Sequence, residues 1–271
     1  MYRTLKLEIK GAVATVALNR PEARNAMSAA LMREMIACAG RLAALRAVDV
    51  AIVRGSGKWF SAGADLRDAS RWGNAARPLE EQREIAALGY RMARAWEEVP
   101  QVTIAAIEGY AIGGGLALCA ALDWRVIARD AFVSLPEISL GIPLTWGTLP
   151  RLVNLVGPAR AKRLAILCER VSAADALSMG LVDEVCEPGT ALAVSEQWMK
   201  KALEQPKHSV LMTKETVNAY ASIGAHAASH MAHDQVQLAA ASAEAKAARE
   251  AFAARKRKSA SPAGSRTRRR R

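Results

Sequence analysis

The sequence has no hydrophobic run near the roughly 20 residues that a membrane-spanning helix needs, and its first ten residues lack the apolar core of a signal peptide. Aromatic residues make up only 5% of the chain. The cysteines are few, and none are in CxxC spacing: Cys38, Cys119, Cys168 and Cys186. Scattered thiols are typical of reduced, buried cysteines and argue against a disulfide framework or a cysteine zinc site. We therefore expect a cytoplasmic protein without a membrane segment.

Positive charge is concentrated at the C-terminus. The formal net charge is +12, but nine basic residues and no acidic ones lie between Arg255 and Arg271, which leaves about +3 for the rest. From Ser259 onward, Ser, Ala, Pro and Gly precede an arginine run, a composition that predicts disorder. The body gives no reason to expect nucleic-acid binding, and RNA contacts through the basic tail remain the minor alternative.

Short apolar runs alternate with segments of helical periodicity in the first two thirds of the chain. Strands are expected at residues 5–9, 13–18, 48–53, 102–107, 125–128 and 132–135, and helices at 28–46, 79–99 and 113–122. This alternation predicts an α/β fold with parallel strands. Ser172 and Asp175 form a capping-box pattern for a helix that Gly180 ends.

After Pro188 only helical patterns occur, at residues 189–203, 206–221 and 225–258. We expect a single core over residues 1–195, a helical region over 196–258 and a disordered basic tail over 259–271.

Two loops with small residues each follow a predicted buried strand. The first spans residues 59–66 and contains Gly63, and the second spans 108–116 and carries Gly113, Gly114 and Gly115 at a predicted helix start. Small residues let the backbone approach a ligand, and a helix start presents unpaired N–H groups. One N–H from each loop would form an oxyanion hole for a thioester carbonyl. Taken alone, either loop is equally consistent with tight packing, and the glycines match neither a Walker loop nor a Rossmann fingerprint.

The two loops together make the sequence similar to the crotonase (enoyl-CoA hydratase/isomerase) family. The likeness begins at residues 18–27, runs through both loops, Pro136-Glu137, Gly147-Thr148 and Arg151-Leu152, and ends near residues 252–258. It implies a ClpP-like spiral of ββα units with a C-terminal helical region that builds trimers or hexamers. It also implies an acyl-CoA thioester substrate and no separate cofactor, because coenzyme A is part of the substrate.

The resemblance also implies roles for individual residues. It places the oxyanion donors at the backbone N–H groups of Ala64 and Gly114. The substrate contacts that it implies come from both loops and two arginines: Ala62, Asp65, Leu66, Gly113, Arg24 and Arg67. A solvated surface position is the alternative for each arginine. Basic residues within 255–258 are expected to reach the coenzyme A of a neighbouring subunit.

Family hydratases use two glutamates, of which this sequence has one. The first glutamate position is occupied by Ala117, which cannot move a proton, and the second by Glu137. A carboxylate beside an apolar pocket has its pKa raised toward neutrality, which suits proton transfer. Enolate chemistry therefore remains expected, and the reaction stays open between double-bond isomerisation and atypical hydration. Asp68 and Glu84 are candidates for a replacement acid, and a non-catalytic acyl-CoA-binding protein is the alternative that Ala117 suggests.

Three further features complete the prediction. Trp146 lies where relatives have small residues, so it either narrows or caps the acyl pocket or is a packed core tryptophan. His226, His230 and His233 share one helical face, which we expect to be a subunit contact or solvated surface and not a metal site. Ser61 lacks the GxSxG pattern of a serine hydrolase.

Overall fold

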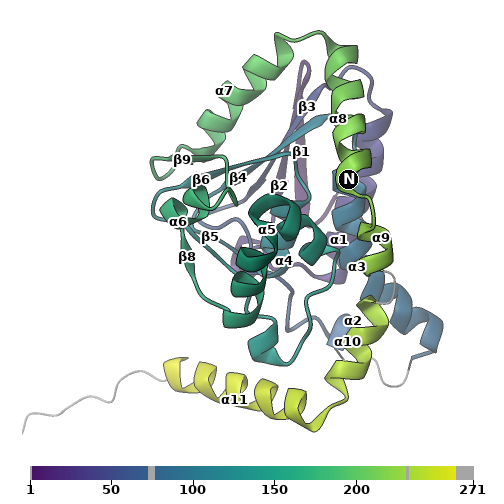
Figure 1. Cartoon of the computed structure of the whole chain (residues 1–271), viewed down its shortest axis with the longest axis vertical. Coiled ribbons are helices and arrows are strands. Elements are labelled where there is room, and N and C mark those ends of the chain that lie inside the picture. Colours follow the sequence, from purple (N-terminus) through teal and green to yellow (C-terminus); the bar gives the residue numbers. More distant parts are fainter. Residues whose placement is uncertain (1, 73–76, 230–231, 261–271) are drawn as a thin grey trace, which may run out of the picture.

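The computed structural model describes residues 2–72, 77–229 and 232–260. Its centre is a six-stranded sheet in the order β1-β2-β3-β4-β6-β9 (Figure 1). The strands are β1 (Leu5–Lys10), β2 (Val13–Leu18), β3 (Val50–Gly55), β4 (Val102–Ile107), β6 (Trp124–Ala128) and β9 (Glu184–Cys186). Among the described pairings of this six-stranded sheet, only the β1–β2 hairpin, which turns at Gly11, is antiparallel, so the predicted parallel α/β arrangement is confirmed.

A second, three-stranded sheet has the order β5-β7-β8. Its strands are β5 (Tyr110–Ile112), β7 (Phe132–Ser134) and β8 (Val171–Ser172). Strand β5 follows β4 after a turn at Gly109 (φ 63°), so the chain leaves the large sheet and enters the small one immediately before the glycine triplet.

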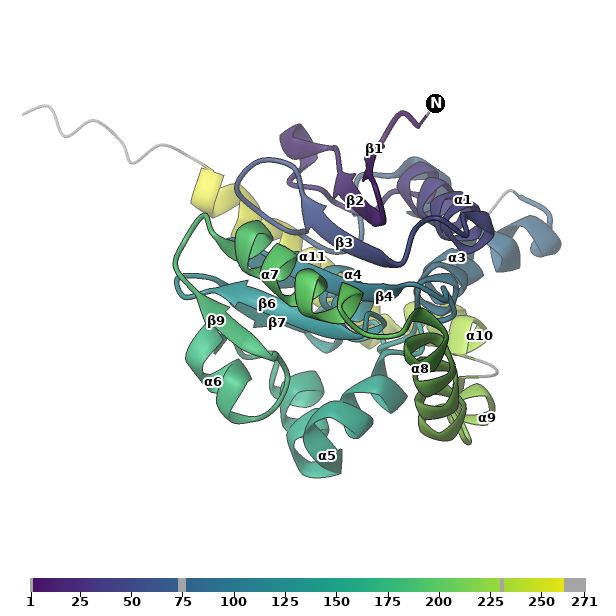
Figure 2. The same ribbon diagram turned by 90° about the horizontal axis from the view of Figure 1, so that it is seen from above.

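Helices cover both faces of the large sheet. Alternate residues of β3, such as Ala51 and Val53, face α1 (Ala29–Ala44), α3 (Leu79–Glu97) and α4 (Gly114–Ala120) in the main core. Val50 and Ile52 face the opposite side, where α7 (Ala191–Leu203) lies along the strands (Figure 2). This two-sided burial explains why the parallel strands are continuous apolar runs.

Helix starts follow the capping signals. The side chain of Ser28 accepts a hydrogen bond from the N–H of Leu31 at the start of α1. The side chain of Ser172 accepts one from Asp175 at the start of α6 (Ala173–Ser178), which confirms the predicted cap. The remaining helical segments near the sheets are α2 (Ala69–Trp72), α5 (Thr148–Leu167), and the 3-10 turns η1 (Pro21–Ala23) and η2 (Ile138–Leu140).

The C-terminal region is helical, but the continuous helix expected over residues 225–258 is wrong. The structure has α8 (Lys207–Ala221), α9 (Ala225–Ser229), α10 (Ala232–Ala240) and α11 (Ala243–Ala260). The chain turns between α10 and α11, where the Ser242 hydroxyl accepts a hydrogen bond from the N–H of Ala245. This turn directs α11 back to η2, where Ala245 packs on Gly141.

Some predictions concern residues outside this description. The structure does not describe the side chains of His226, His230 and His233 or the tail from residue 261. Within the described residues, no group of three or more metal-binding side chains occurs, and no helix is long and apolar enough for a membrane span.

Candidate active site

The two glycine-containing loops lie side by side. The N–H groups of Phe60 and Ser61 donate to the carbonyls of Glu108 (2.9 Å) and Tyr110 (3.2 Å), and Ile112 donates to the carbonyl of Ser61 (3.0 Å). Gly63 has φ 83°, and a Cβ atom there would lie 2.6 Å from the carbonyl oxygen of Ile112. A side chain at Gly63 would therefore push the two loops apart.

The pairing of the first loop with Met27 orients the backbone of Ala64. Met27 donates to the carbonyl of Gly63 (2.7 Å) and accepts from the N–H of Asp65 (3.1 Å). In a parallel bridge of this kind, the intervening residue points its own N–H and C=O away from the partner. The N–H of Ala64 is thus directed away from Met27, and Ala64 lines a cavity.

The N–H of Gly114 opens α4. The first hydrogen bond of this helix runs from the N–H of Ala117 to the carbonyl of Gly113 (2.9 Å), so the N–H of Gly114 precedes the helical ladder. Gly113 holds φ 53° and ψ −119° and donates to the carbonyl of Ser134 (2.8 Å) in β7. Gly114 lines the same cavity as Ala64, so the structure brings the two predicted donors to one site.

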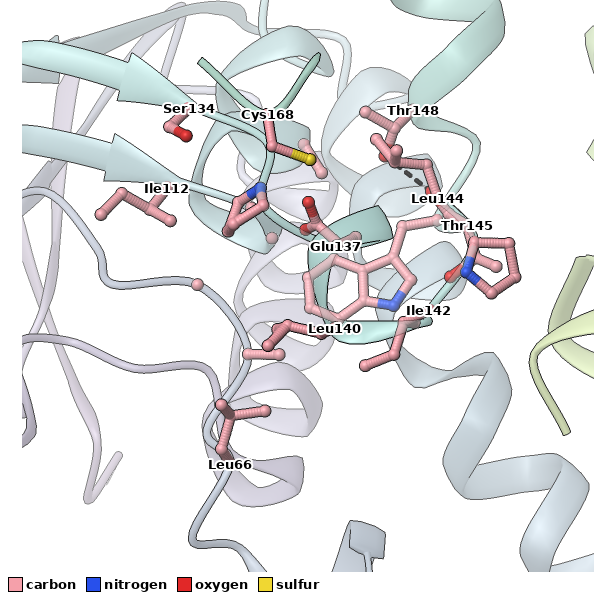
Figure 3. Close-up of a pocket in the computed structure, with 18 of the residues that line it drawn as sticks. Leu66, Ile112, Ser134, Glu137, Leu140, Ile142, Leu144, Thr145, Thr148 and Cys168 are labelled. Carbon is pink, nitrogen blue, oxygen red and sulfur yellow. Dashed lines mark hydrogen bonds between the residues drawn. The ribbon is translucent and has the colours of Figure 1, made fainter. Parts of the chain in front are cut away.

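This cavity has a volume of about 820 Å³ and lies between α3, α4, the small sheet and the segment after η2. Most of its lining side chains are apolar, including Ile85, Leu140, Ile142, Leu144 and Trp146. Figure 3 shows Leu140, Ile142 and Leu144 around Glu137, which lies near the centre of the group. An apolar cavity with few polar groups is the usual form of a small-molecule site.

Glu137 is the only carboxylate among the described residues that line the cavity. Its Oε2 atom is buried and has no hydrogen-bond partner among the described residues, and its Oε1 atom lies against Gly113. Burial disfavours the charged carboxylate and raises the pKa of Glu137 to about 7. A carboxyl group with that pKa can both accept and donate a proton near neutral pH.

Among the described residues that line the cavity, no second acid accompanies Glu137. Ala117 lines the cavity and is almost fully buried. Asp68 instead accepts hydrogen bonds from the N–H of Ala29 (2.7 Å) and from Ser70, and Glu84 is exposed on α3. Neither candidate replacement acid lines the cavity.

Comparison with known proteins decides the family. Residues 8–260 match the family model described as enoyl-CoA hydratase/isomerase. The chain belongs to this family. A short-chain-enoyl-CoA hydratase from Clostridium acetobutylicum is 32% identical over 213 residues, which cover 78% of this chain and 80% of that protein. A crotonyl-CoA hydratase from Syntrophomonas wolfei is 33% identical over 218 residues, covering 80% of this chain and 82% of that protein.

Solved structures of the family share the fold. An enoyl-CoA hydratase/isomerase from Xanthobacter autotrophicus Py2 superposes with a TM-score of 0.85 and 27% identity, covering 97% of this chain and all of that one. An enoyl-CoA hydratase from Mycobacterium avium subsp. paratuberculosis K-10 gives a TM-score of 0.83 and 25% identity, covering 94% of this chain and 97% of that one. The α/β architecture is therefore the crotonase fold, as the sequence motifs indicated.

The coenzyme A contacts expected for an enoyl-CoA hydratase/isomerase are only partly gathered at the cavity. Ala62, Leu66 and Gly113 line it. The Asp65 carboxylate is buried in an ion pair with Arg20 (2.8 Å) and accepts from the N–H of Arg67 (3.0 Å), so its side chain orders the loop. The side chains of Arg24 and Arg67 are exposed and do not line the cavity.

An aromatic row extends from the first loop to the cavity. The Arg24 guanidinium lies 5.5 Å from the ring centroid of Trp59, which stacks on Tyr110, and Tyr110 contacts Phe132 of the cavity wall. A cation over an aromatic face is favourable, and Arg24 is positioned in this way.

Two arginines and a cysteine are among the cavity residues that sequence reasoning missed. Arg170 lines the cavity with its guanidinium 4.7 Å from the Phe132 centroid, and Arg249 of α11 lines it as well. Cys168, at the end of α5, has φ 54° and lines the cavity, and Figure 3 shows its thiol on the side of Glu137. No motif marks these positions, because they reach the cavity only through the turns after α5 and before α11.

Trp146 is both buried and part of the cavity wall. Its side chain is 7% exposed, and Cβ atoms built on Gly89 or Gly114 would overlap its indole. Its backbone has φ 61°, which is uncommon for a large residue. The Trp146 carbonyl accepts a hydrogen bond from the buried guanidinium of Arg151 (2.9 Å). Trp146 is thus packed in the core and also lines the cavity, and its role toward an acyl chain stays a prediction.

Proposed function

We propose that the protein is an enoyl-CoA enzyme that stabilises a thioester enolate with the N–H groups of Ala64 and Gly114 and transfers a proton with Glu137. The observation that supports this best is that these residues line one apolar cavity, in which Glu137 is the only described carboxylate. Family membership supports the substrate class, because the relatives named above are enoyl-CoA hydratases.

The chemistry begins at the thioester carbonyl. Two N–H donors that bind its oxygen stabilise the negative charge that develops when a proton leaves the neighbouring carbon. Loss of one such donor costs on the order of 10²–10³ in rate. The apolar walls strengthen this stabilisation, because charge interactions are screened less where water is excluded.

A single carboxylate favours double-bond isomerisation. Glu137 removes a proton from C2 of a 3-enoyl-CoA, the electrons shift through the enolate, and the same carboxyl group returns a proton to C4 to give the 2-enoyl-CoA. The reaction consumes no other reactant and leaves the carboxylate ionised again. Hydration additionally requires a group that holds and activates water, and Ala117 offers none.

For the rest of the substrate, we assign the coenzyme A moiety to the first loop. The backbone of Ala62, Asp65 and Leu66 faces its adenine end, and Arg24 and Arg67 lie nearby for its phosphates or ribose. Exposure of both arginines supports this, because a phosphate has access to them. The acyl chain enters the apolar cavity, where Trp146 caps it.

We also propose self-association as a trimer or hexamer. Helix α8 and the turn after it expose large apolar side chains, among them Met212 (67% exposed), Val217 (59%), Tyr220 (80%) and Ile223 (76%). Exposed apolar groups gathered in this way are typical of protein interfaces. Light scattering of the purified protein measures the assembly directly.

The experiment that tests the function compares wild type with Glu137→Gln. Turnover of 3-hexenoyl-CoA, crotonyl-CoA and an aryl-enoyl-CoA is assayed, and affinity for the unreactive hexanoyl-CoA is measured by calorimetry. We expect isomerisation of 3-hexenoyl-CoA by wild type, loss of turnover in the variant and similar affinity in both. Binding without any wild-type turnover would instead support the non-catalytic acyl-CoA-binding protein that Ala117 suggests.

A further inference from the structure

The indole of Trp146 is wedged between two helices. Cβ atoms on Gly89, inside α3, and on Gly114, at the start of α4, would both overlap it, so the ring lies directly on the two backbones. Glycine inside a helix costs about 1 kcal/mol relative to alanine. At Gly89 this loss of helix stability is accompanied by a gain in space, because the missing side chain leaves room for the indole. Helix α3 and the indole are therefore fitted to each other.

A partly buried ion pair holds the backbone at Trp146. Arg151 donates to the carbonyls of Trp146 (2.9 Å) and Gly147 (3.1 Å) and to both oxygens of Glu97 (2.8 and 2.6 Å). These bonds hold Trp146 and Gly147 at positive φ, 61° and 66°. A strained backbone that its surroundings hold in place often marks a functional position.

The indole packs on Gly114, on the face of α4 where the missing acid would stand. Ala117 lies three residues after Gly114, so the two share one face of the helix, and both line the cavity. Ala117 offers a methyl group, and the indole covers Gly114 with the carbon atoms of its six-membered ring. A bound water needs two to four polar partners, and neither the Ala117 methyl group nor the ring carbons that lie on Gly114 can serve as one.

We propose that Trp146 determines which reaction occurs by keeping water from the acyl chain beside Ala117, so that Glu137 moves a proton between substrate carbons and does not add water. This inference rests on the proposed function and names its reaction selectivity. Ala117 and Trp146 act as a pair: one lacks the group that would hold a water, and the other fills its space. A tryptophan that served packing alone would affect stability and leave the fate of the transferred proton unchanged.

The first test follows that proton. 3-Hexenoyl-CoA deuterated at C2 is converted in ordinary water, and the deuterium at C4 of the product is measured by mass spectrometry. Wild type should retain label through internal transfer, and Trp146→Gly should retain several-fold less because water exchanges with the Glu137 carboxyl group. Trp124→Phe, in the core on the α7 side of the large sheet, is the control for altering a tryptophan elsewhere.

The second test restores hydration. Crotonyl-CoA hydration should rise by about 10²-fold in Ala117→Glu/Trp146→Gly over Ala117→Glu alone, because general acid–base groups contribute on that scale once water has room. Ala117→Gln/Trp146→Gly lacks the acid and should stay at the background rate. Circular dichroism confirms folding, and Trp146→Leu replaces Trp146→Gly in both tests if the glycine variant unfolds.

The outcomes separate the two proposals. Wild-type isomerisation with equal label loss in wild type and Trp146→Gly would overturn the role of Trp146 and leave the proposed function intact. Equal hydration rates for Ala117→Glu and Ala117→Glu/Trp146→Gly would likewise overturn the role of Trp146 and leave the proposed function intact. Absence of turnover of every 3-enoyl-CoA by the wild type would overturn both.

Discussion

The Oε1 atom of Glu137 lies 2.5 Å from the position that a Cβ atom on Gly113 would take. The carboxyl group therefore rests on the backbone of the residue before Gly114, whose N–H is a proposed oxyanion donor. The lack of a side chain at Gly113 thus brings the group proposed to transfer the proton next to the group proposed to stabilise the charge.

Gly113→Ala should remove activity. The new methyl group would displace the Glu137 carboxyl group, and a misplacement of about 1 Å can cost 10²-fold in rate. The backbone strain of a non-glycine residue at this conformation adds about 1–3 kcal/mol of destabilisation. The measurement is kcat/KM for 3-hexenoyl-CoA alongside thermal unfolding. Gly11→Ala is the control, because Gly11 has a similar φ of 58° and nothing within 4 Å of a Cβ atom. Equal activity loss in both variants would contradict this relationship.

Glu137→Gln should stabilise the protein at neutral and higher pH. Burial raises the pKa of Glu137 from 4.5 to about 7 in the folded state, so the folded state binds its proton more tightly than the unfolded state does. The contribution of the protonated group is fully present below pH 4.5 and is lost as the pH rises to about 7, by on the order of 3 kcal/mol. Urea unfolding of wild type and variant between pH 4 and 8 measures this difference. Glu84→Gln, on the exposed side of α3, is the control for the same substitution at the surface.

The rate should follow the ionised form of the same group. A carboxylate that abstracts a proton must be charged in the free enzyme, so kcat/KM should rise with pH and level off above about 7, the pKa of Glu137. The profile is recorded with 3-hexenoyl-CoA from pH 5 to pH 9. A rate that falls over this range would assign the base to another group.

Gly89→Ala should destabilise the protein although alanine is the better helix former. Its methyl group would overlap the Trp146 indole, and overpacking of this kind typically costs about 1–3 kcal/mol. In a Trp146→Gly background the same substitution has room and should be tolerated. A double-mutant cycle by urea unfolding measures the coupling. The matched control is Gly40→Ala in α1, where a Cβ atom meets nothing within 4 Å and a gain of up to about 1 kcal/mol is expected.

Much of the fold could be predicted because buried parallel strands leave a direct trace in sequence. The strand predicted at residues 102–107 matches β4, and the Ser28 and Ser172 caps lie where their hydroxyls suggested. Strands β5, β8 and β9 were missed, although the equally short β7 was predicted at residues 132–135. Strands of two or three residues carry little periodicity, and they pair only after the sheets assemble. The turn at Ser242 was missed because its alanine-rich surroundings contain neither glycine nor proline.

The candidate site likewise has a part that could be predicted from the sequence and a part that could not. Ala64, Gly114 and Glu137 each belong to a short sequence motif, so each could be predicted from its neighbours in sequence. All three line one cavity in the structure. The contact between Gly89 and Trp146 joins residues of different elements and leaves no motif, so only the folded chain reveals it. Cys168 and Arg170 are likewise brought to the cavity by the turn after α5.

The most direct test of the central claim is the carbonyl stretch of a bound thioester. Crotonyl-CoA labelled with ¹³C at the thioester carbonyl is bound to Glu137→Gln, which prevents turnover, and its infrared difference spectrum is compared with that of the free compound. If the N–H groups of Ala64 and Gly114 both bind the carbonyl oxygen, the stretch shifts to clearly lower frequency. A bound carbonyl that absorbs at the frequency of the free thioester would contradict the account.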